Sequence, residues 1–195
     1  MSVIFGKTTT AKWKGAANEY FVANELRKKL PNDKYKIIDN LYIKLGEKIH
    51  TTQIDHIIVS SYGIFCIETK GNSGSIYGSP KAKYWKSYLK GIGYEFYNPL
   101  KQNQAHKFAI EKLLTQQGIS ANVECFISFP TATKLRLGGA KNVGTTAEVI
   151  SMIKEKKHIL LDRQQVDTVF GLLKSNNLIS RETIKQHKYE ITNNR

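Results

Sequence analysis

The sequence predicts a mixed α/β fold, in which helices flank a central mixed β-sheet that contains an antiparallel hairpin. Residues 51–70, TTQIDHIIVSSYGIFCIETK, form two apolar, β-branched runs joined by a short turn, which is typical of a hairpin. Residues 14–30 and 100–117 repeat apolar side chains at helical spacing. The 195 residues, 41% hydrophobic and 24% charged, have the size and composition of one globular domain spanning residues 1–195.

The first predicted helix spans residues 14–30 and ends before Pro31, because proline cannot continue it. Its apolar stripe consists of Ala16, Ala23, Leu26 and Leu30. At about 100° per residue, Glu19 falls inside this stripe, whereas Glu25 points the opposite way into solvent. Two interpretations of Glu19 stay open: a glutamate at the edge of the stripe, or a carboxylate directed at the hairpin acids.

A strand is predicted at residues 35–45, with a turn at Gly46 and Glu47 that leads into the hairpin. If Ser61 and Tyr62 form the hairpin turn, Ser60 pairs with Gly63. The same register places Asp55 directly opposite Glu68, with their Cβ atoms roughly 5 Å apart. A three-residue loop would instead place these two acids on opposite faces of the hairpin.

Two carboxylates in such apolar strands repel each other unless something positive lies between them. Asp55 and Glu68 therefore predict a divalent cation, Mg²⁺ or Mn²⁺, which prefers carboxylate oxygens. Glu19 and the carbonyl of Thr69 are candidates for further ligands. Such a metal lowers the pKa of a bound water and neutralises charge on a phosphate. Lys70 and Gln102 are the predicted catalytic partners of this site, since they could orient the water or stabilise the transition state.

The segment 71–107 interleaves lysines with aromatic residues and contains one acid, Glu95. In such a pattern the lysines suit contact with phosphates and the aromatic rings suit stacking on bases. The residues predicted to contact nucleic acid are Lys81, Lys83, Trp85, Lys86, Lys101 and His106. The alternative is that the aromatics form core and the lysines a solvated face, and for His106 packing is equally open. His56 points away from the Asp55 face, so we expect it in the core or behind the site.

Further elements are predicted after Asn98-Pro99, with Gln102 and His106 on the packed face of the helix at 100–117. A buried strand spans 123–129. The region 131–195 is predicted as a loop, a helix near 146–156, a short strand at 158–161 and two more helices. Asp162 with Gln165 resembles a capping box, and Ser180 is a candidate cap for the last helix.

The charge of the chain favours an anionic partner, because 30 Lys and Arg against 16 Asp and Glu leave +14 and a pI near 9.7. The sequence contains no run of about 18 apolar residues, so no transmembrane helix is expected. The N-terminus lacks the apolar core of a secretory signal. Cys66 and Cys125 lie in apolar runs and are expected to be reduced core residues, which predicts a cytoplasmic protein.

Several motifs resemble the nuclease-related domain (NERD) family, which belongs to the PD-(D/E)XK nuclease superfamily. They are G-A-A-N-E at 15–19, T-Q-I-D-H-I-I-V at 52–59, G-I-F-C-I-E-T-K at 63–70, Trp85, and N-P-L-K-Q-N-Q-A-H at 98–106. The resemblance covers about residues 15–129, with 131–195 as a C-terminal αβ extension. It implies a restriction-endonuclease-like core, Mg²⁺-dependent phosphodiester hydrolysis, and active positions at Glu19, Asp55, Glu68, Lys70 and Gln102.

Three functions compete at this point: a metal-dependent DNA nuclease, a nucleic-acid-binding module with this fold but little turnover, and a protein that binds partners or anionic membranes through its lysines. DNA is the expected partner. Nucleases of this type often use two active sites to cut two strands, so a homodimer is an alternative to a monomer.

Overall fold

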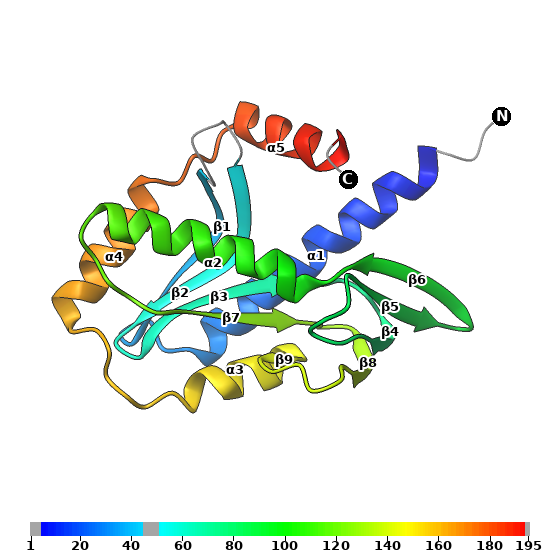
Figure 1. Ribbon diagram of the computed structural model, residues 1–195, viewed down its shortest axis with the longest axis horizontal. Helices are drawn as coiled ribbons and strands as arrows, with labels where there is room; N and C mark the ends of the chain where they lie inside the picture. The colour runs from blue at the N-terminus through cyan, green and yellow to red at the C-terminus, as the bar shows by residue number, and fades with distance from the viewer. Residues whose placement is uncertain (1–4, 45–50, 194–195) are drawn as a thin grey trace.

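A five-stranded mixed sheet forms the centre of the molecule in the computed structural model, which describes the backbone of residues 5–44 and 51–193 and the side chains of residues 15–44 and 51–189 (Figure 1). Its strand order is β1-β2-β3-β7-β9. These strands are β1 (Tyr35–Lys44), β2 (Thr51–Ser60), β3 (Gly63–Thr69), β7 (Val123–Ser128) and β9 (Val143–Gly144). Antiparallel pairing joins β1, β2 and β3, whereas β7 and β9 add in parallel, which confirms the predicted mixed α/β class.

Helices cover both faces of this sheet. On one face, α1 (Phe5–Lys29) and α3 (Thr146–Lys154) pack their apolar side chains against Phe65, Ile67 and Phe126. On the other, α2 (Pro99–Gln116) and α4 (Arg163–Ser175) cover Ile57, Ile64 and Cys66. The last helix, α5 (Arg181–Asn193), lies beside β2. Because both faces are covered, β3 is buried along its whole length.

A second sheet extends from the end of β3 and β7, in the order β6-β5-β4-β8 (Figure 1). Its strands are β4 (Gly74–Tyr77), β5 (Tyr84–Leu89), β6 (Ile92–Tyr97) and β8 (Ala132–Arg136). Gly74 lets β4 pass close to β5: its φ is +77°, and a Cβ there would lie 2.1 Å from the carbonyl oxygen of Tyr88. Ile76 and Trp85 hold this sheet against Ile127 and Phe129.

The hairpin has the predicted register, since Ser60 pairs with Gly63 and His56 with Ile67 across a two-residue turn at Ser61 and Tyr62. The Ser61 carbonyl accepts the backbone N–H groups of Leu160 and Leu161, at 2.8 and 3.1 Å. This register carries Asp55 and Glu68 to the end of the hairpin that faces the second sheet.

Several sequence predictions need correction. Residues 158–161 are not a strand, although two of their N–H groups bind the hairpin turn. Conversely, β8 and β9 arise within a region predicted as loop, because β4 and β7 supply their pairing partners. Ala16 was placed on the apolar stripe of α1, yet it is exposed; Val22 is the buried member that the prediction left out.

The predicted helix caps are confirmed. Asp162 and Gln165 form a reciprocal capping box on α4, and Ser180 Oγ accepts the Thr183 N–H at 3.0 Å before α5. Leu45 and the turn at Gly46 and Glu47 lie outside the described residues. None of the helices within the described ranges has both the length and the apolar composition needed to cross a membrane.

Candidate active site

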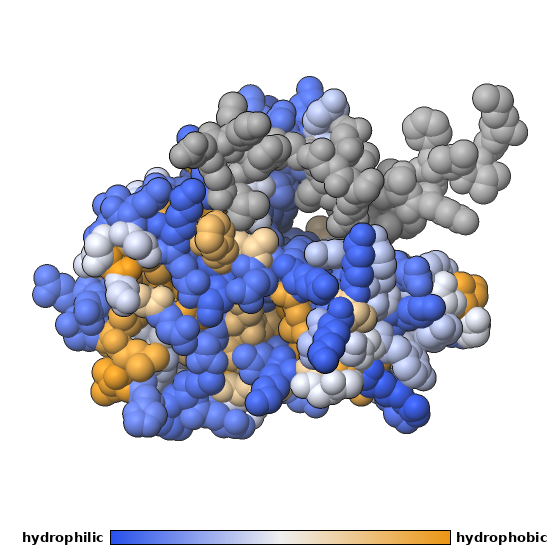
Figure 2. Space-filling view, in the orientation of Figure 1, coloured by the Kyte–Doolittle hydropathy of each residue, from blue (hydrophilic) through white to orange (hydrophobic). Residues whose placement is uncertain are grey.

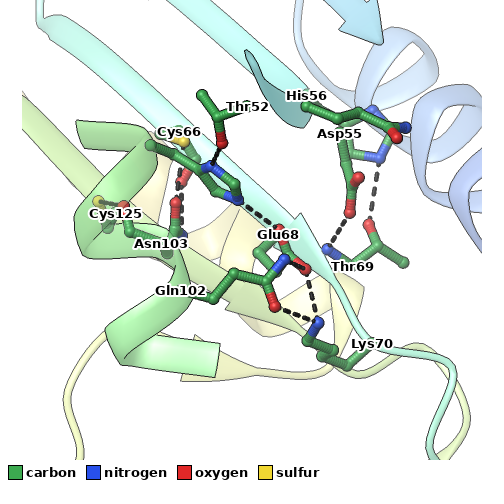
Figure 3. A network of polar contacts seen from close by, with 12 residues as sticks. Thr52, Asp55, His56, Cys66, Glu68, Thr69, Lys70, Gln102, Asn103 and Cys125 are labelled. Atoms are coloured by element: carbon green, nitrogen blue, oxygen red, sulfur yellow. Dashed lines mark hydrogen bonds and ion pairs between the residues drawn. The ribbon is translucent and has the colours of Figure 1, made fainter. Parts of the chain in front are cut away.

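Glu68 lies near the end of β3, where three side chains contact its carboxylate (Figure 3). Lys70 Nζ is 2.6 Å and Gln102 Nε2 2.7 Å from Oε1, and His106 Nε2 is 3.1 Å from Oε2. Burial alone would raise the pKa of Glu68, but the charge of Lys70 and the contact with His106 outweigh it and lower this pKa to about 2. Glu68 is therefore held ionised.

Lys70 completes a triangle, because its Nζ also donates to Gln102 Oε1 at 2.8 Å. Its backbone N–H donates to the Ser128 carbonyl at 2.8 Å, which fixes the chain directly after β3. Gln102 comes from the first turn of α2, where Asn98 caps the helix by accepting the Leu100 N–H at 3.0 Å. The predicted pair of Lys70 and Gln102 is thus brought together at Glu68.

Asp55 lies on β2 beside Glu68 and is buried. Its Oδ2 accepts the backbone N–H of Thr69 at 2.8 Å (Figure 3). Burial raises the pKa of Asp55 well above its ordinary value, and the negative charges of Glu68 and Glu19 raise it further. The hairpin therefore holds one ionised carboxylate next to a second that is costly to ionise.

Glu19 is half-buried on α1 and lies within electrostatic reach of the hairpin. Burial raises its pKa; the charge of Glu68 raises it too, while His56 and Lys70 act in the opposite direction. Its carboxylate is therefore close enough to sense the hairpin charges, while its role as a metal ligand stays a prediction. Burial, together with the negative charges of Glu19 and Asp55, raises the pKa of Tyr42 on β1 to about 12.

The donor chemistry of this cluster fits a hard divalent cation. Asp55, Glu68 and Glu19 offer carboxylate oxygens, and burial with mutual repulsion raises the pKa values of Asp55 and Glu19 despite the nearby Lys70, so a bound cation would favour their ionised forms. Within residues 15–44 and 51–189, no three His, Cys, Asp or Glu side chains already form a ready-made cage. Mg²⁺ commonly binds through one or two carboxylates and keeps several waters, so an open arrangement of this kind suits it.

A comparison with known protein families identifies the family of this chain. The family model of the nuclease-related domain, NERD, matches residues 14–130, which is more than half of the chain and includes each of the site residues named above. The chain belongs to the NERD family.

Individual relatives add little about activity. An uncharacterized protein of Bacillus anthracis is 30% identical over 184 residues, covering 93% of this chain and 85% of that protein. A solved crystal structure, described as protein of unknown function AF1548, is 17% identical with a TM-score of 0.34, over 90% of this chain and 99% of its own.

Behind the NERD site runs a polar chain that the sequence did not predict. Arg27 pairs with Asp39, whose Oδ1 lies 2.7 Å from His56 Nδ1; His56 Nε2 is 3.1 Å from Thr69 Oγ1. Thr69 in turn binds Asp55 through its N–H. The prediction that His56 lies behind the site is confirmed. The sequence alone does not identify Asp39 as a partner of His56, because the two residues meet only through the β1–β2 register.

Asn103, next to Gln102, is the second site-forming residue that the sequence did not single out. It is fully buried, donates to the Phe126 carbonyl at 2.9 Å and accepts from Cys66 Sγ at 2.9 Å. These bonds fasten α2 to β3 and β7. Cys66 and Cys125 are both free thiols, as predicted.

Two of the residues predicted to contact nucleic acid are buried in the NERD domain. Trp85 has no exposed surface and donates its indole N–H to the Ser79 carbonyl at 2.9 Å, so its ring cannot stack on a base. His106 is also buried, between Glu68 and Thr52, and acts on the carboxylate instead of the substrate surface. The remaining predicted contacts, which are exposed, are Lys81, Lys83, Lys86 and Lys101.

Proposed function

We propose that this NERD protein is a metal-dependent nuclease that hydrolyses phosphodiester bonds of DNA. The observation that carries the proposal is the convergence of Asp55, Glu68 and Lys70 at one end of the hairpin, with Gln102 bridging Lys70 and Glu68. Carboxylates beside a lysine suit phosphoryl chemistry, in which negative charge on the phosphate must be neutralised.

Each site residue has a role in the proposed reaction. Asp55, Glu68, Glu19 and the Thr69 carbonyl would hold Mg²⁺ or Mn²⁺, which when bound supplies an acidified water and neutralises the phosphate. Lys70, held near the carboxylates by Gln102, orients the attacking water or stabilises the charge that develops on the phosphate. His106 fixes the second oxygen of Glu68.

The expected partner follows from charge. A net charge of +14 favours DNA, and the exposed lysines of the second sheet and α2 provide phosphate contacts. Free cysteines agree with a cytoplasmic protein. A homodimer would supply two such sites for two strands.

The test is incubation of the purified protein with plasmid, linear duplex and single-stranded DNA, with Mg²⁺, with Mn²⁺ and with a chelator. We expect cleavage that requires the metal and is lost in Asp55→Ala and Lys70→Ala. Metal-independent cleavage, or cleavage that survives these substitutions, would contradict the proposal.

A second function, a nucleic-acid-binding module with little turnover, is favoured by one observation. Glu68 already accepts from three side chains, which compete with a metal for its oxygens. This function predicts DNA binding that is unaffected by chelator, with no cleavage of any of the three substrates.

A further inference from the structure

The second sheet presents one face that its packing leaves open. Side chains alternate along β5, so Trp85 and Ser87 point toward the core and are buried, while Tyr84 and Tyr88 point outward. The pairing with β6 places Tyr97 beside Tyr84 on this outer face. The Trp85 and Phe129 ring centroids lie 6.3 Å apart, so the inner face is filled at the end of the sheet next to the core, although it is exposed near the tip of the β5–β6 hairpin.

The outer face carries four tyrosines arranged as two pairs. The rings of Tyr77 and Tyr88 meet edge to face with centroids 5.5 Å apart, and those of Tyr84 and Tyr97 with centroids 6.2 Å apart. Their exposed fractions are 38% for Tyr77 and Tyr97, 43% for Tyr88 and 51% for Tyr84. None of the four rings belongs to the core clusters of the described residues, and a group of exposed aromatic side chains marks an interaction surface.

Cations surround the four rings. Lys83 Nζ lies 5.3 Å from the centroid of the Tyr84 ring, and the Arg136 guanidinium lies 5.6 Å from that of Tyr77. Lys86 and Lys134 occupy outward positions between them, by the pairing of β5 and β8 with β4. Glu95 is the acid on this face among the described strands, and it pairs with Lys86 at 3.2 Å. Where β5 and β6 lie, Figure 2 shows dark blue, strongly hydrophilic residues among pale ones, with orange, hydrophobic residues at the tip of the hairpin.

We propose that this tyrosine face, made of Tyr77, Tyr84, Tyr88 and Tyr97, binds single-stranded nucleic acid by stacking bases on its rings and pairing phosphates with the flanking Lys83, Lys86, Lys134 and Arg136. Flat aromatic rings among cations suit a single strand because its base faces are accessible. In a duplex those faces are already stacked inside the helix, so only the phosphates could contact this surface. The choice of nucleic acid as partner rests on the proposed nuclease function.

Short connections join the second sheet to the strands of the active site. β4 begins four residues after Lys70, and in this connection Asn72 Nδ2 donates to Ser87 Oγ at 3.4 Å. On the other side, β8 follows β7 after a short turn, and the Ser128 carbonyl at the end of β7 holds the Lys70 N–H. A strand bound on the tyrosines therefore lies on a sheet that follows directly from the strand carrying Glu68.

The test is fluorescence anisotropy with a labelled single strand of about 12 nucleotides and a duplex of the same length, without divalent metal. We expect the double substitution Tyr84→Ala and Tyr88→Ala to weaken single-strand binding by about tenfold or more, since each stacked base contributes strongly. Duplex binding should change little. Tyr84→Phe and Tyr88→Phe should retain the affinity, because stacking needs the ring and not the hydroxyl.

Tyr94→Ala is the matched control. Tyr94 lies in the same hairpin and is 58% exposed, but it pairs with Ser87 and therefore points to the opposite face. An equal loss of affinity in Tyr94→Ala, or an equal loss for single strand and duplex, would overturn the proposal. If the tyrosine substitutions instead abolish self-association in light scattering and leave oligonucleotide affinity intact, the face binds a second copy of the chain, which also overturns it.

Two further measurements separate this inference from the nuclease proposal and from folding defects. Asp55→Asn, which should not cleave DNA, should still bind the single strand like the wild type. Single-strand binding by the wild type without any metal-dependent cleavage would overturn the nuclease proposal alone. Ultraviolet cross-linking of the wild type to a halogenated single strand, mapped by mass spectrometry, requires no substitution. Cross-links on Tyr84 or Tyr88 support the proposal, and cross-links confined to other segments contradict it.

Discussion

His106 on α2 lies with its Nε2 atom 3.1 Å from Oε2 of Glu68 on β3, while its Nδ1 atom lies 2.6 Å from Thr52 Oγ1. Both side chains are buried, with 5% and 4% of their surface exposed. The imidazole therefore has one partner on each side and cannot rotate freely. Through it, a helix fixes how the hairpin carboxylate is oriented.

From this contact we expect His106→Ala to raise the Mg²⁺ concentration for half-maximal DNA cleavage by about 10- to 100-fold, because groups that orient metal ligands commonly have effects of this size. His106→Gln, which keeps a donor for Glu68, should lie between the alanine variant and the wild type. A metal titration of the cleavage rate measures this. Reduced DNA affinity with an unchanged metal titration would show that His106 contacts substrate instead.

Lys70→Ala should lower the single-turnover cleavage rate by about 10²- to 10³-fold, the usual cost of removing a group that stabilises transition-state charge. DNA affinity should remain close to that of the wild type, because Nζ is engaged by Glu68 and Gln102. Lys70→Arg should not restore the rate, since a planar guanidinium does not fit the place of a compact ammonium. Full activity in the arginine variant would contradict the assigned role.

Asp55→Asn should stabilise the metal-free protein at pH 7 while abolishing cleavage. The folded pKa of Asp55 lies above its ordinary 3.8, owing to burial and to Glu68 and Glu19. Ionised Asp55 therefore destabilises the fold as the pH rises above 3.8, and removing the charge should gain about 1 kcal/mol, or about 2–4 °C in Tm.

Differential scanning fluorimetry tests this expectation at two pH values. The gain in Tm should shrink as the pH falls below 3.8, where Asp55 becomes protonated in both the folded and the unfolded states. Mg²⁺ should raise the Tm of the wild type more than that of Asp55→Asn, because a cation bound by the native state stabilises it. A variant less stable than the wild type at pH 7 would refute this account.

Asp39→Asn should destabilise the protein by about 1–2 kcal/mol at pH 7, because the charge-assisted contacts with His56 and Arg27 are lost. Burial would raise the pKa of Asp39, but these two contacts lower it below its ordinary 3.8. The stabilisation is therefore present above pH 3.8 and disappears as the pH falls toward the lowered pKa of the folded protein.

Urea unfolding across this pH range measures the difference between wild type and Asp39→Asn. Asp33→Asn, which changes an exposed aspartate at the start of the same strand region, is the control and should leave stability unchanged. A difference that persists unchanged to low pH would show that the effect is not electrostatic.

Trp85→Ala should cost about 3–5 kcal/mol of stability, because a fully buried ring leaves a cavity beside Phe129. Trp85→Phe should recover much of this loss and bind DNA normally. Tyr84→Ala, a change at the next residue on the exposed face, should barely affect thermal unfolding. If Trp85→Ala instead keeps normal stability and binds DNA weakly, Trp85 contacts nucleic acid and is not a core residue.

The sequence by itself determined the parts of the site that depend on local geometry. Given a two-residue turn, the two-residue period of a strand places Asp55 and Glu68 on one face; the sequence left the length of the turn open, and the structure supplied it. Helical spacing likewise aligns Gln102 with His106, and the capping residues mark the start of α4. These relations involve neighbours in the chain, so beyond the length of that turn no knowledge of the tertiary structure is needed to derive them.

Only the tertiary structure decided which face met which partner. Alternation separates Trp85 from Tyr84, but packing against Phe129 decides that the tryptophan is buried and the tyrosine exposed. Likewise His106 was as consistent with a substrate contact as with packing until α2 was placed across β3, where its partner is Glu68. The short strands β8 and β9 exist because β4 and β7 pair with them. Burial and long-range pairing depend on segments that are distant in the sequence, so local sequence patterns do not predict them.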